Sequence, residues 1–309
     1  MSDVFAASAS IISRGSKSFA AAARLFDPTT RGHAIMLYAW CRHCDDEIDG
    51  QDLGIGQRSP APPEQRARLE QLRRDTEAAM RGEAVDGTPF VAFQRVFLEC
   101  DIPRNYPLEL LDGFAMDVEG HECRTLSDTL RYCYHVAGTV GGMMATVMGI
   151  RDPEVVARAV DLGIAFQLTN IARDVMQDAA DGRCYLPRQW LADAGVPEDT
   201  GQFPDHRDVI YGQTIRILDE AERYYESARH GIGRLRFRNA WAIASALAIY
   251  RDIGRVVRRD GPDVWQHRAT VGVGRKLVLL LKGAALAGLQ VTFGRRRTAP
   301  IRRGLWSAS

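Results

Sequence analysis

Acidic side chains crowd the segment CRHCDDEIDG at residues 41–50. In a helix, residues spaced by 4, 3 and 4 positions fall on one narrow stripe. Such a stripe here comprises Tyr38, Arg42, Asp45 and Asp49. A single acidic stripe is most simply a solvated helix face, so this segment alone does not decide between a surface and a ligand site.

A second polar stripe lies further along the chain. Gln167, Asn170, Asp174 and Asp178 are spaced by 3, 4 and 4, again one face of a helix. Most residues between them are apolar, which predicts that this helix is buried. Buried carboxylates are costly unless they are paired or bind a metal. Two stripes, one of them embedded in apolar sequence, therefore favour a shared ligand over two solvated faces.

The type of ligand follows from the donor atoms. Oxygen donors favour Mg²⁺, Mn²⁺ or Ca²⁺ over zinc. A calcium EF-hand loop beginning at Asp45 would place Gly56 where a bidentate Glu is required. A di-iron bundle needs Glu-x-x-His pairs, which the sequence lacks. Magnesium usually takes one or two carboxylates together with phosphate oxygens, so we expect two facing stripes to clamp a diphosphate through Mg²⁺, with Mn²⁺ as a substitute.

Basic residues near the stripes supply candidate donors for that diphosphate. No other phosphate-binding motif is present, because the GIG at 54–56 and the GVG at 272–274 lack the third glycine of a dinucleotide fingerprint and no P-loop occurs. Neither NADPH nor ATP is therefore expected. The candidate donors are Lys17, Arg42, Arg173, Arg183 and Arg268.

A run of small residues, YCYHVAGTVGGMMATV, precedes the second stripe. A glycine inside a helix costs about 1 kcal/mol relative to alanine, so three within five positions call for a reason. Close packing of helices and a tunnel for a long hydrocarbon explain them equally well. The residues of this face are Tyr132, Val136, Gly138, Gly141, Gly142 and Ala145.

The elements that carry these candidate residues are all predicted to be helices. The fold class is therefore a single all-α bundle, with one domain over residues 1–309 that includes a basic tail from about 294. Asp27-Pro28 and Asp152-Pro153 each predict an N-cap followed by proline at the first helical position, and Ser127 is expected to cap a helix ending near Met148. Residues 50–63 are predicted to be loop. The helices are expected at 28–49, 64–81, 88–100, 104–119, 127–148, 153–178, 205–230, 239–259 and 273–292.

The composition of the chain limits its possible partners and its compartment. The formal net charge is +1, which gives no sign of a nucleic-acid partner. Six cysteines without an apparent secretory signal predict a reduced, cytoplasmic protein, and the CxxC of Cys41 and Cys44 lacks the second pair a zinc site needs.

The apolar stretch 277–293 is interrupted by Lys282 and precedes an arginine-rich tail. We expect region 277–303 to contact a membrane peripherally rather than span it.

Four motifs in order, SKSF, YAWCRHCDDEID, YCYHVAGTVGG and QLTNIARDV…DGRCYLP, resemble those of the squalene/phytoene synthase family over roughly residues 8 to 280. The resemblance implies an isoprenoid-synthase helical bundle with a central cavity. It also implies Mg²⁺-dependent, head-to-head joining of two prenyl diphosphates, with geranylgeranyl diphosphate as substrate and a cyclopropyl diphosphate as intermediate.

The same resemblance implies roles for individual residues. Asp45, Asp49, Asn170, Asp174 and Asp178 match metal ligands, and the four aspartates also match catalytic positions. Gln177 departs from the family pattern, in which Glu is common. Tyr38, Tyr132 and Tyr250 match tyrosines of the reaction chamber, Tyr132 and Tyr250 being catalytic candidates. The substrate-binding candidates are Gly15, Ser16, Lys17, Ser18, Phe19, Tyr38, Arg42, Gln167, Arg173, Arg183, Tyr185 and Arg268.

Three alternatives stay open at this point. The DDxxD and the spacing of Asn170, Asp174 and Asp178 also occur in terpene cyclases, although SKSF and GRCYLP argue against that class. A squalene or dehydrosqualene synthase would use the C15 substrate farnesyl diphosphate. A non-catalytic helical protein could use both stripes for assembly or lipid contacts through bound cations.

Overall fold

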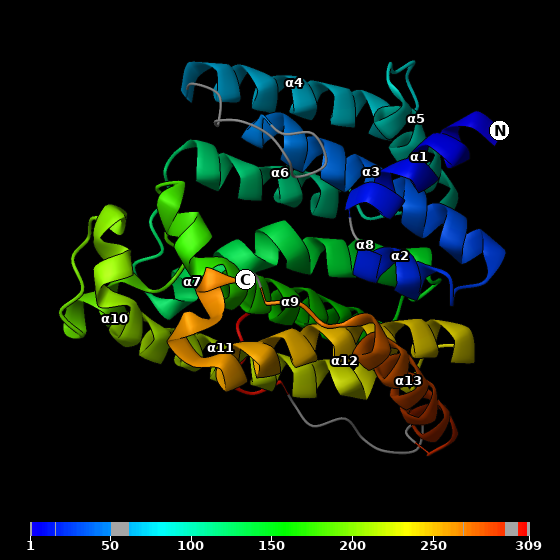
Figure 1. Ribbon diagram of the computed structural model, residues 1–309. Helices are drawn as coiled ribbons and strands as arrows, with labels where there is room; N and C mark the ends of the chain where they lie inside the picture. The colour runs from blue at the N-terminus through cyan, green and yellow to red at the C-terminus, as the bar shows by residue number, and fades with distance from the viewer. Residues whose placement is uncertain (1, 16, 51–61, 268, 294–301, 308–309) are drawn as a thin grey trace.

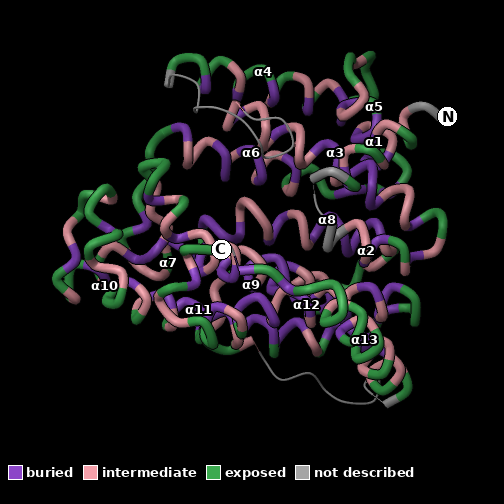
Figure 2. Tube along the Cα trace, in the orientation of Figure 1, coloured by how far each residue is buried: buried purple, intermediate pink, exposed green. Residues whose placement is uncertain are grey.

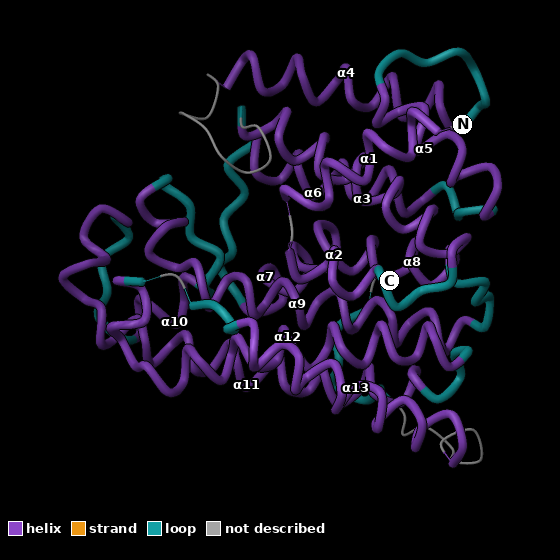
Figure 3. Tube along the Cα trace, turned by 45° about the vertical axis from the view of Figure 1, so that its right-hand side comes forward, coloured by secondary structure: helices purple, strands orange, loops and turns teal. Residues whose placement is uncertain are grey.

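The computed structural model describes residues 2–15, 17–50, 62–267, 269–293 and 302–307, without the side chains of 2, 3, 14, 15, 17–19, 62 and 293. The all-α prediction is confirmed, because the described residues form helices and loops and include no strand (Figure 3). The helices are α1 (Ser2–Gly15), α2 (Lys17–Ala23), α3 (Pro28–Asp49), α4 (Pro62–Met80), α5 (Thr88–Cys100), α6 (Asn105–Val118), α7 (Leu126–Cys133), α8 (Thr139–Val147), α9 (Pro153–Ala180), α10 (Arg188–Asp193), α11 (Arg207–Ile232), α12 (Phe237–Asp260) and α13 (Val273–Phe293).

Local signals explain where the two site helices begin and end. The Asp27 carboxylate accepts hydrogen bonds from the amides of Thr29 and Thr30 at the start of α3, and Gly50 ends that helix with a left-handed φ of 64°. At the start of α9, the Asp152 carboxylate accepts from the Glu154 amide. Both predicted starts are confirmed.

The predicted helix over 127–148 is interrupted in the structure. The predicted cap at Ser127 is wrong: Thr125 caps α7, because its hydroxyl and the Asp128 carboxylate form a reciprocal capping box. A π-helical turn over Tyr134–Gly138 then separates α7 from α8. Helices α1 and α2 are further elements that the sequence analysis did not predict.

The helices stack in layers. In Figure 1, α4 lies above α3 and α6, α8 and α9 lie in the middle, and α11 and α12 lie below. Buried residues face inward along these layers, whereas α10, α13 and the outer face of α4 carry many exposed residues (Figure 2).

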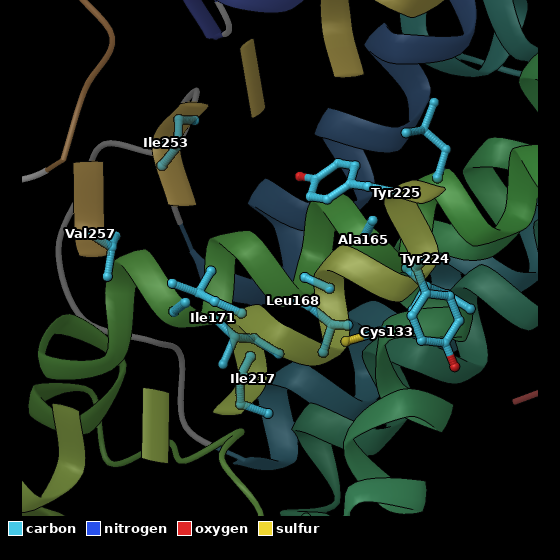
Figure 4. Packing of buried hydrophobic residues seen from close by; sticks show 14 of the residues in the cluster. Cys133, Ala165, Leu168, Ile171, Ile217, Tyr224, Tyr225, Ile253 and Val257 are labelled. Atoms are coloured by element: carbon cyan, nitrogen blue, oxygen red, sulfur yellow. The ribbon is translucent and has the colours of Figure 1, made fainter. Parts of the chain in front are cut away.

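Two hydrophobic clusters form the core. The N-terminal cluster is built mainly by α3, α5 and α6, around Trp40 and Phe93, whose rings stack with centroids 4.1 Å apart. The C-terminal cluster joins α9, α11 and α12, where Leu168 and Ile171 pack near Ile217 (Figure 4). Helix α9 is the one described helix long and apolar enough to span a membrane, but 61% of its most apolar window is buried, as expected for a core helix.

Candidate active site

A cavity of about 410 Å³ lies between the two hydrophobic clusters. Leu37 and Phe114 line it from the N-terminal cluster, and Leu162 and Ile249 line it from the C-terminal cluster. Its size is within the usual range for small-molecule sites. Most of its wall is apolar, and the polar and charged residues that line it are Tyr38, Arg42, Asp45, Asp49, Asp117, Tyr132, Arg158, Gln167, Asn170, Arg183 and Tyr250.

Helix α9 shows how the cavity is oriented. One face of this helix lines the cavity from Asn170 back to Val155, a distance of about 22 Å at 1.5 Å per residue. Asn170 and Gln167 are polar, whereas Phe166, Leu162 and Ala159 follow as apolar or small residues. The cavity thus has a polar end near the aspartates and a long apolar part beyond it.

The first aspartate stripe lies at the polar end. Arg42 forms ion pairs with Asp45 at 3.0 Å and with Asp46 at 2.9 Å. The pKa of Asp45 is raised to about 7, mainly because burial disfavours its charged form, with Asp49, Asp46 and Asp117 adding negative charge. About 41% of the Asp45 side chain is still accessible, so a cation can reach it.

The second stripe approaches the first through Arg183. The Arg183 guanidinium donates to Asp49 at 2.6 Å, and its positive charge also lowers the pKa of Asp178. That pKa is nevertheless raised to about 8, first by burial and then by the negative charge of Asp174. Arg173 pairs with Asp174 on the same helix. Arg183 therefore links the two stripes, which are distant in sequence: it pairs with Asp49 of the first stripe and its charge lowers the pKa of Asp178 of the second.

Asp117 on α6 is a site residue that the sequence analysis missed. Its carboxylate accepts hydrogen bonds from the hydroxyls of Tyr132 at 3.0 Å and Tyr185 at 2.8 Å, and the two rings stack with centroids 4.4 Å apart. Burial raises the pKa of Asp117 to about 6. Two acids, Asp112 and Asp117, interrupt the apolar run LLDGFAMDV. An acid among apolar residues also marked the second stripe, so the sequence contained a signal for Asp117.

The three predicted chamber tyrosines all line the cavity. The Tyr250 ring stacks on Phe166 with centroids 4.1 Å apart. Burial raises the pKa of Tyr38 to about 12, so its phenol stays neutral at physiological pH. Tyr185 lies behind Tyr132 and does not line the cavity.

The donor set at the polar end fits Mg²⁺. Asn170 Oδ1 is buried and has no hydrogen-bond partner among the described residues, although its amide nitrogen donates to Gln167 at 3.3 Å. An orphaned buried carbonyl oxygen beside carboxylates is a natural ligand for a hard cation. Within the described ranges, no three His, Cys, Asp or Glu side chains converge as a ready-made metal cluster. Ions held by one or two side chains and by substrate oxygens fit this arrangement.

Some predicted positions cannot be placed in the same way. Six substrate-binding candidates lie outside the residues whose side chains are described. Gln177 is exposed and donates to Asp181, away from the cavity lining. The undescribed candidates are Gly15, Ser16, Lys17, Ser18, Phe19 and Arg268.

The glycine run serves both purposes that the sequence left open. A Cβ at Gly141 would lie 2.2 Å from the Ala159 carbonyl oxygen, and one at Gly142 would lie 2.6 Å from the Tyr106 ring, so close helix packing requires glycine at both positions. Gly141 and Ala145 also line the cavity. Close approach of α8 to α9 therefore shapes the apolar wall.

Comparison with known proteins agrees with this geometry. The squalene/phytoene synthase family model matches residues 12–275. The chain is 49% identical to the 15-cis-phytoene synthase of Paracoccus sp. (strain N81106 / MBIC 01143), over 99% of this chain and 98% of the relative, and 48% identical to that of Pantoea ananas, over 94% of each. The fold matches a crystal structure of a dehydrosqualene synthase with a TM-score of 0.81 and 28% identity, covering 92% of this chain and 96% of the other. The chain belongs to the squalene/phytoene synthase family.

Proposed function

We propose that this chain is a phytoene synthase, a prenyltransferase that joins two molecules of geranylgeranyl diphosphate head to head in the first committed step of carotenoid biosynthesis. The observation that carries the proposal is the cavity itself, whose carboxylate-rich end continues into a mostly apolar part, so that the face of α9 that lines it spans about 22 Å in all. A diphosphate attached to a long hydrocarbon has the same division into a charged and an apolar part.

The charged residues bind and orient the diphosphates. The residues that would hold Mg²⁺ at the polar end are Asp45, Asp49, Asn170, Asp174 and Asp178. When bound, Mg²⁺ neutralises the diphosphate and makes it a better leaving group. Arg42, Arg173 and Arg183, which pair with the aspartates here, donate hydrogen bonds to diphosphate oxygens once substrate is present.

The apolar wall protects the reacting carbons. Ionisation of one substrate leaves an allylic cation, and the C2=C3 bond of the second molecule attacks it to form a cyclopropyl diphosphate. The aromatic residues Tyr132, Tyr250 and Phe166 line the cavity, where their rings stabilise the positive charge. Apolar neighbours exclude water, which would otherwise trap the cation. Ring opening and loss of the second diphosphate complete the reaction, with two protons released overall and no reductant consumed.

The decisive experiment incubates the purified chain with Mg²⁺ and C20 or C15 prenyl diphosphate, without NADPH. We expect a C40 hydrocarbon from the C20 substrate. Preferred use of the C15 substrate with a C30 product would instead indicate a dehydrosqualene synthase. Diphosphate release with only C20 products would indicate a cyclase, and no consumption of either substrate would overturn the enzymatic proposal.

The same chemistry favours a peripheral membrane contact, with the chain otherwise in the cytoplasm, because the C40 product is insoluble in water. Helix α13 exposes an apolar face, with Val273 85%, Leu277 60%, Leu281 63% and Leu289 60% accessible. Lys282 is exposed beside Leu281, and its charge complements anionic headgroups. This surface lies on a helix packed against α12, which lines the cavity.

Vesicle binding tests that contact. The double variant Leu277→Ser/Leu281→Ser should lose most of its sedimentation with phosphatidylglycerol vesicles. Leu98→Ser, which removes another exposed leucine (54% accessible) on α5, is the control and should sediment like the unmodified chain. Equal sedimentation of both variants would assign the lipid contact to another surface.

A further inference from the structure

The apolar part of the cavity ends at three turns of the bundle. Its lining follows α9 back to Val155, close to the first residue of that helix, and includes Met148 and Ile150 in the turn between α8 and α9. It also includes Phe26 in the turn between α2 and α3, and Leu235 in the turn between α11 and α12. These three turns, at residues 24–27, 148–152 and 233–236, are called the apolar end below.

Two arginines fasten the three turns to one another. Arg234 in the turn between α11 and α12 forms an ion pair with Asp152, the residue before α9, at 3.0 Å. Arg238 at the start of α12 donates hydrogen bonds to the carbonyl oxygens of Leu25 at 3.1 Å and Phe26 at 3.3 Å. The turn between α11 and α12 is thus joined to both of the others.

The ion pair at the apolar end lies in solvent. The side chains of Arg234 and Asp152 are 51% and 41% accessible. Exposed ion pairs contribute little to stability, because water and salt screen them. Segments held by exposed contacts open locally more readily than core helices do. Opening of the apolar end therefore costs little beyond the packing of the turns themselves.

Helix α13 lies beside the apolar end. Arg275 near the start of α13 pairs with Asp252 in the second half of α12 at 2.7 Å. A Cβ at Gly283 would collide with Ser245 in the first half of α12. The two helices therefore run antiparallel, and the second half of α13 lies next to the beginning of α12. Figure 1 shows α13 at the right-hand side of the bundle, where α11 is connected to α12.

Exposed apolar side chains connect the apolar end to α13. Phe237, the first residue of α12, is 46% accessible, and its ring lies 6.2 Å from that of Trp241. Trp241 in turn donates from its indole nitrogen to the Leu280 carbonyl oxygen on α13, at 2.9 Å. Leu281 and Leu289 on the same helix are also exposed. Grouped apolar side chains on a surface mark a contact with lipid or with another apolar partner.

The chemistry of the product favours departure at this end. The product has lost both diphosphates, so it carries no group that the aspartates and arginines of the polar end can bind. Moving a long hydrocarbon back past those side chains would remove water from crowded charges, which is unfavourable. Moving it forward keeps it against apolar side chains throughout.

We propose that the hydrocarbon product leaves the cavity at the apolar end, when the turns joined by Arg234 and Arg238 open, and passes along Phe237 and α13 into lipid. This inference rests on the proposed function, because it assumes a long, uncharged product.

The test holds the apolar end closed with a reversible bridge. In the double variant Asp152→Cys/Arg234→Cys, a short bis-methanethiosulfonate reagent links the two thiols through disulfides that a reductant breaks again. The same protein is measured before bridging, after bridging and after reduction, with C20 substrate, Mg²⁺ and phosphatidylglycerol vesicles as acceptor. Single-turnover formation of total C40 hydrocarbon reports the chemistry, whereas multiple turnover also requires release.

We expect bridging to leave the single-turnover rate unchanged and to lower the multiple-turnover rate by about tenfold or more, because release then limits the cycle. Reduction should restore it. The matched control is Asp219→Cys/Arg258→Cys, which replaces another exposed ion pair, between α11 and α12, at positions that do not line the cavity. The same treatment should leave both of its rates unchanged, which also accounts for reaction of the reagent with native cysteines.

A second bridge covers the case in which loss of the Asp152 cap prevents folding: Arg24→Cys/Arg238→Cys joins the other two turns and should give the same result. Full multiple turnover in the bridged proteins would overturn the inference. Equal losses in both rates would also overturn it, because the bridge would then impair the chemistry rather than retain the product. Failure of the unmodified chain to form C40 from C20 would overturn the proposed function instead.

Discussion

Charged side chains are balanced differently at the polar end of the cavity and beside its apolar part. At the polar end, the described side chains gather six carboxylates around three guanidinium groups, and burial together with mutual repulsion raises the pKa of Asp45 and Asp178. Beside the apolar part, Asp161 on α9 is fully buried and receives two hydrogen bonds from Arg302. An excess of crowded, partly buried negative charge marks a place built for a cationic ligand, whereas a matched pair marks a structural cluster.

The largest effect is expected from removing charge at the polar end. Asp45→Asn or Asp174→Asn should lower kcat by about 10³-fold or more, because each would remove a proposed ligand for the ion that stabilises the departing diphosphate. Diphosphate release with C20 substrate measures this. Glu70→Gln, at an exposed position on α4, should leave turnover unchanged. Full activity in either aspartate variant would mean that catalysis does not depend on the crowded carboxylates. The contrast in charge between the two parts of the cavity would then have no functional meaning.

A smaller effect is expected from Asp117→Asn. The amide keeps the size of the carboxylate but cannot accept both tyrosine hydrogen bonds equally well, so Tyr132 and Tyr185 lose part of their support. Residues that position other site groups typically contribute about 10–100-fold. We expect that loss in kcat with little change in KM. A change confined to KM would instead place Asp117 in direct contact with substrate.

These residues also show what a sequence can and cannot predict. Asp27-Pro28 and Asp152-Pro153 act on amides within three residues, so the starts of α3 and α9 follow from local pattern. Helical spacing alone placed each aspartate stripe on one face. The ion pair between Arg183 and Asp49 joins residues 134 positions apart, and it depends on how the whole bundle packs. No local pattern encodes such a pair.

The same limit applies beside the apolar part of the cavity. Arg302 reaches Asp161 across 141 positions of sequence, and in the sequence this arginine belongs to a basic tail that indicates either a solvated end or lipid contact. The π-helical turn at Tyr134–Gly138 also depends on tertiary packing, because its residues fit an ordinary helix equally well. The fold and the aspartate stripes were therefore predictable, whereas the distant partners of Asp49 and Asp161 were not.

The smallest expected effect concerns stability without substrate. Asp45 and Asp178 have pKa values of about 7 and about 8 in the folded chain, against about 3.9 for an unfolded aspartate. Between these limits the folded state binds more protons than the unfolded state, so the metal-free protein loses stability as pH rises through this window. Mg²⁺ needs the charged carboxylates and should relieve their repulsion.

Thermal unfolding with and without Mg²⁺ checks this expectation. The rise in Tm caused by Mg²⁺ should be a few degrees larger at about pH 8.5, where both carboxylates are charged, than at about pH 6, where they are largely protonated. Asp45→Asn should reduce that difference, because it removes one of the two titrating groups. The double variant Asp161→Asn/Arg302→Gln should preserve it, since that pair lies beside the apolar part of the cavity. A Mg²⁺ effect independent of pH would mean that the crowded carboxylates are not what the ion neutralises, and the two ends of the cavity would then differ in packing alone.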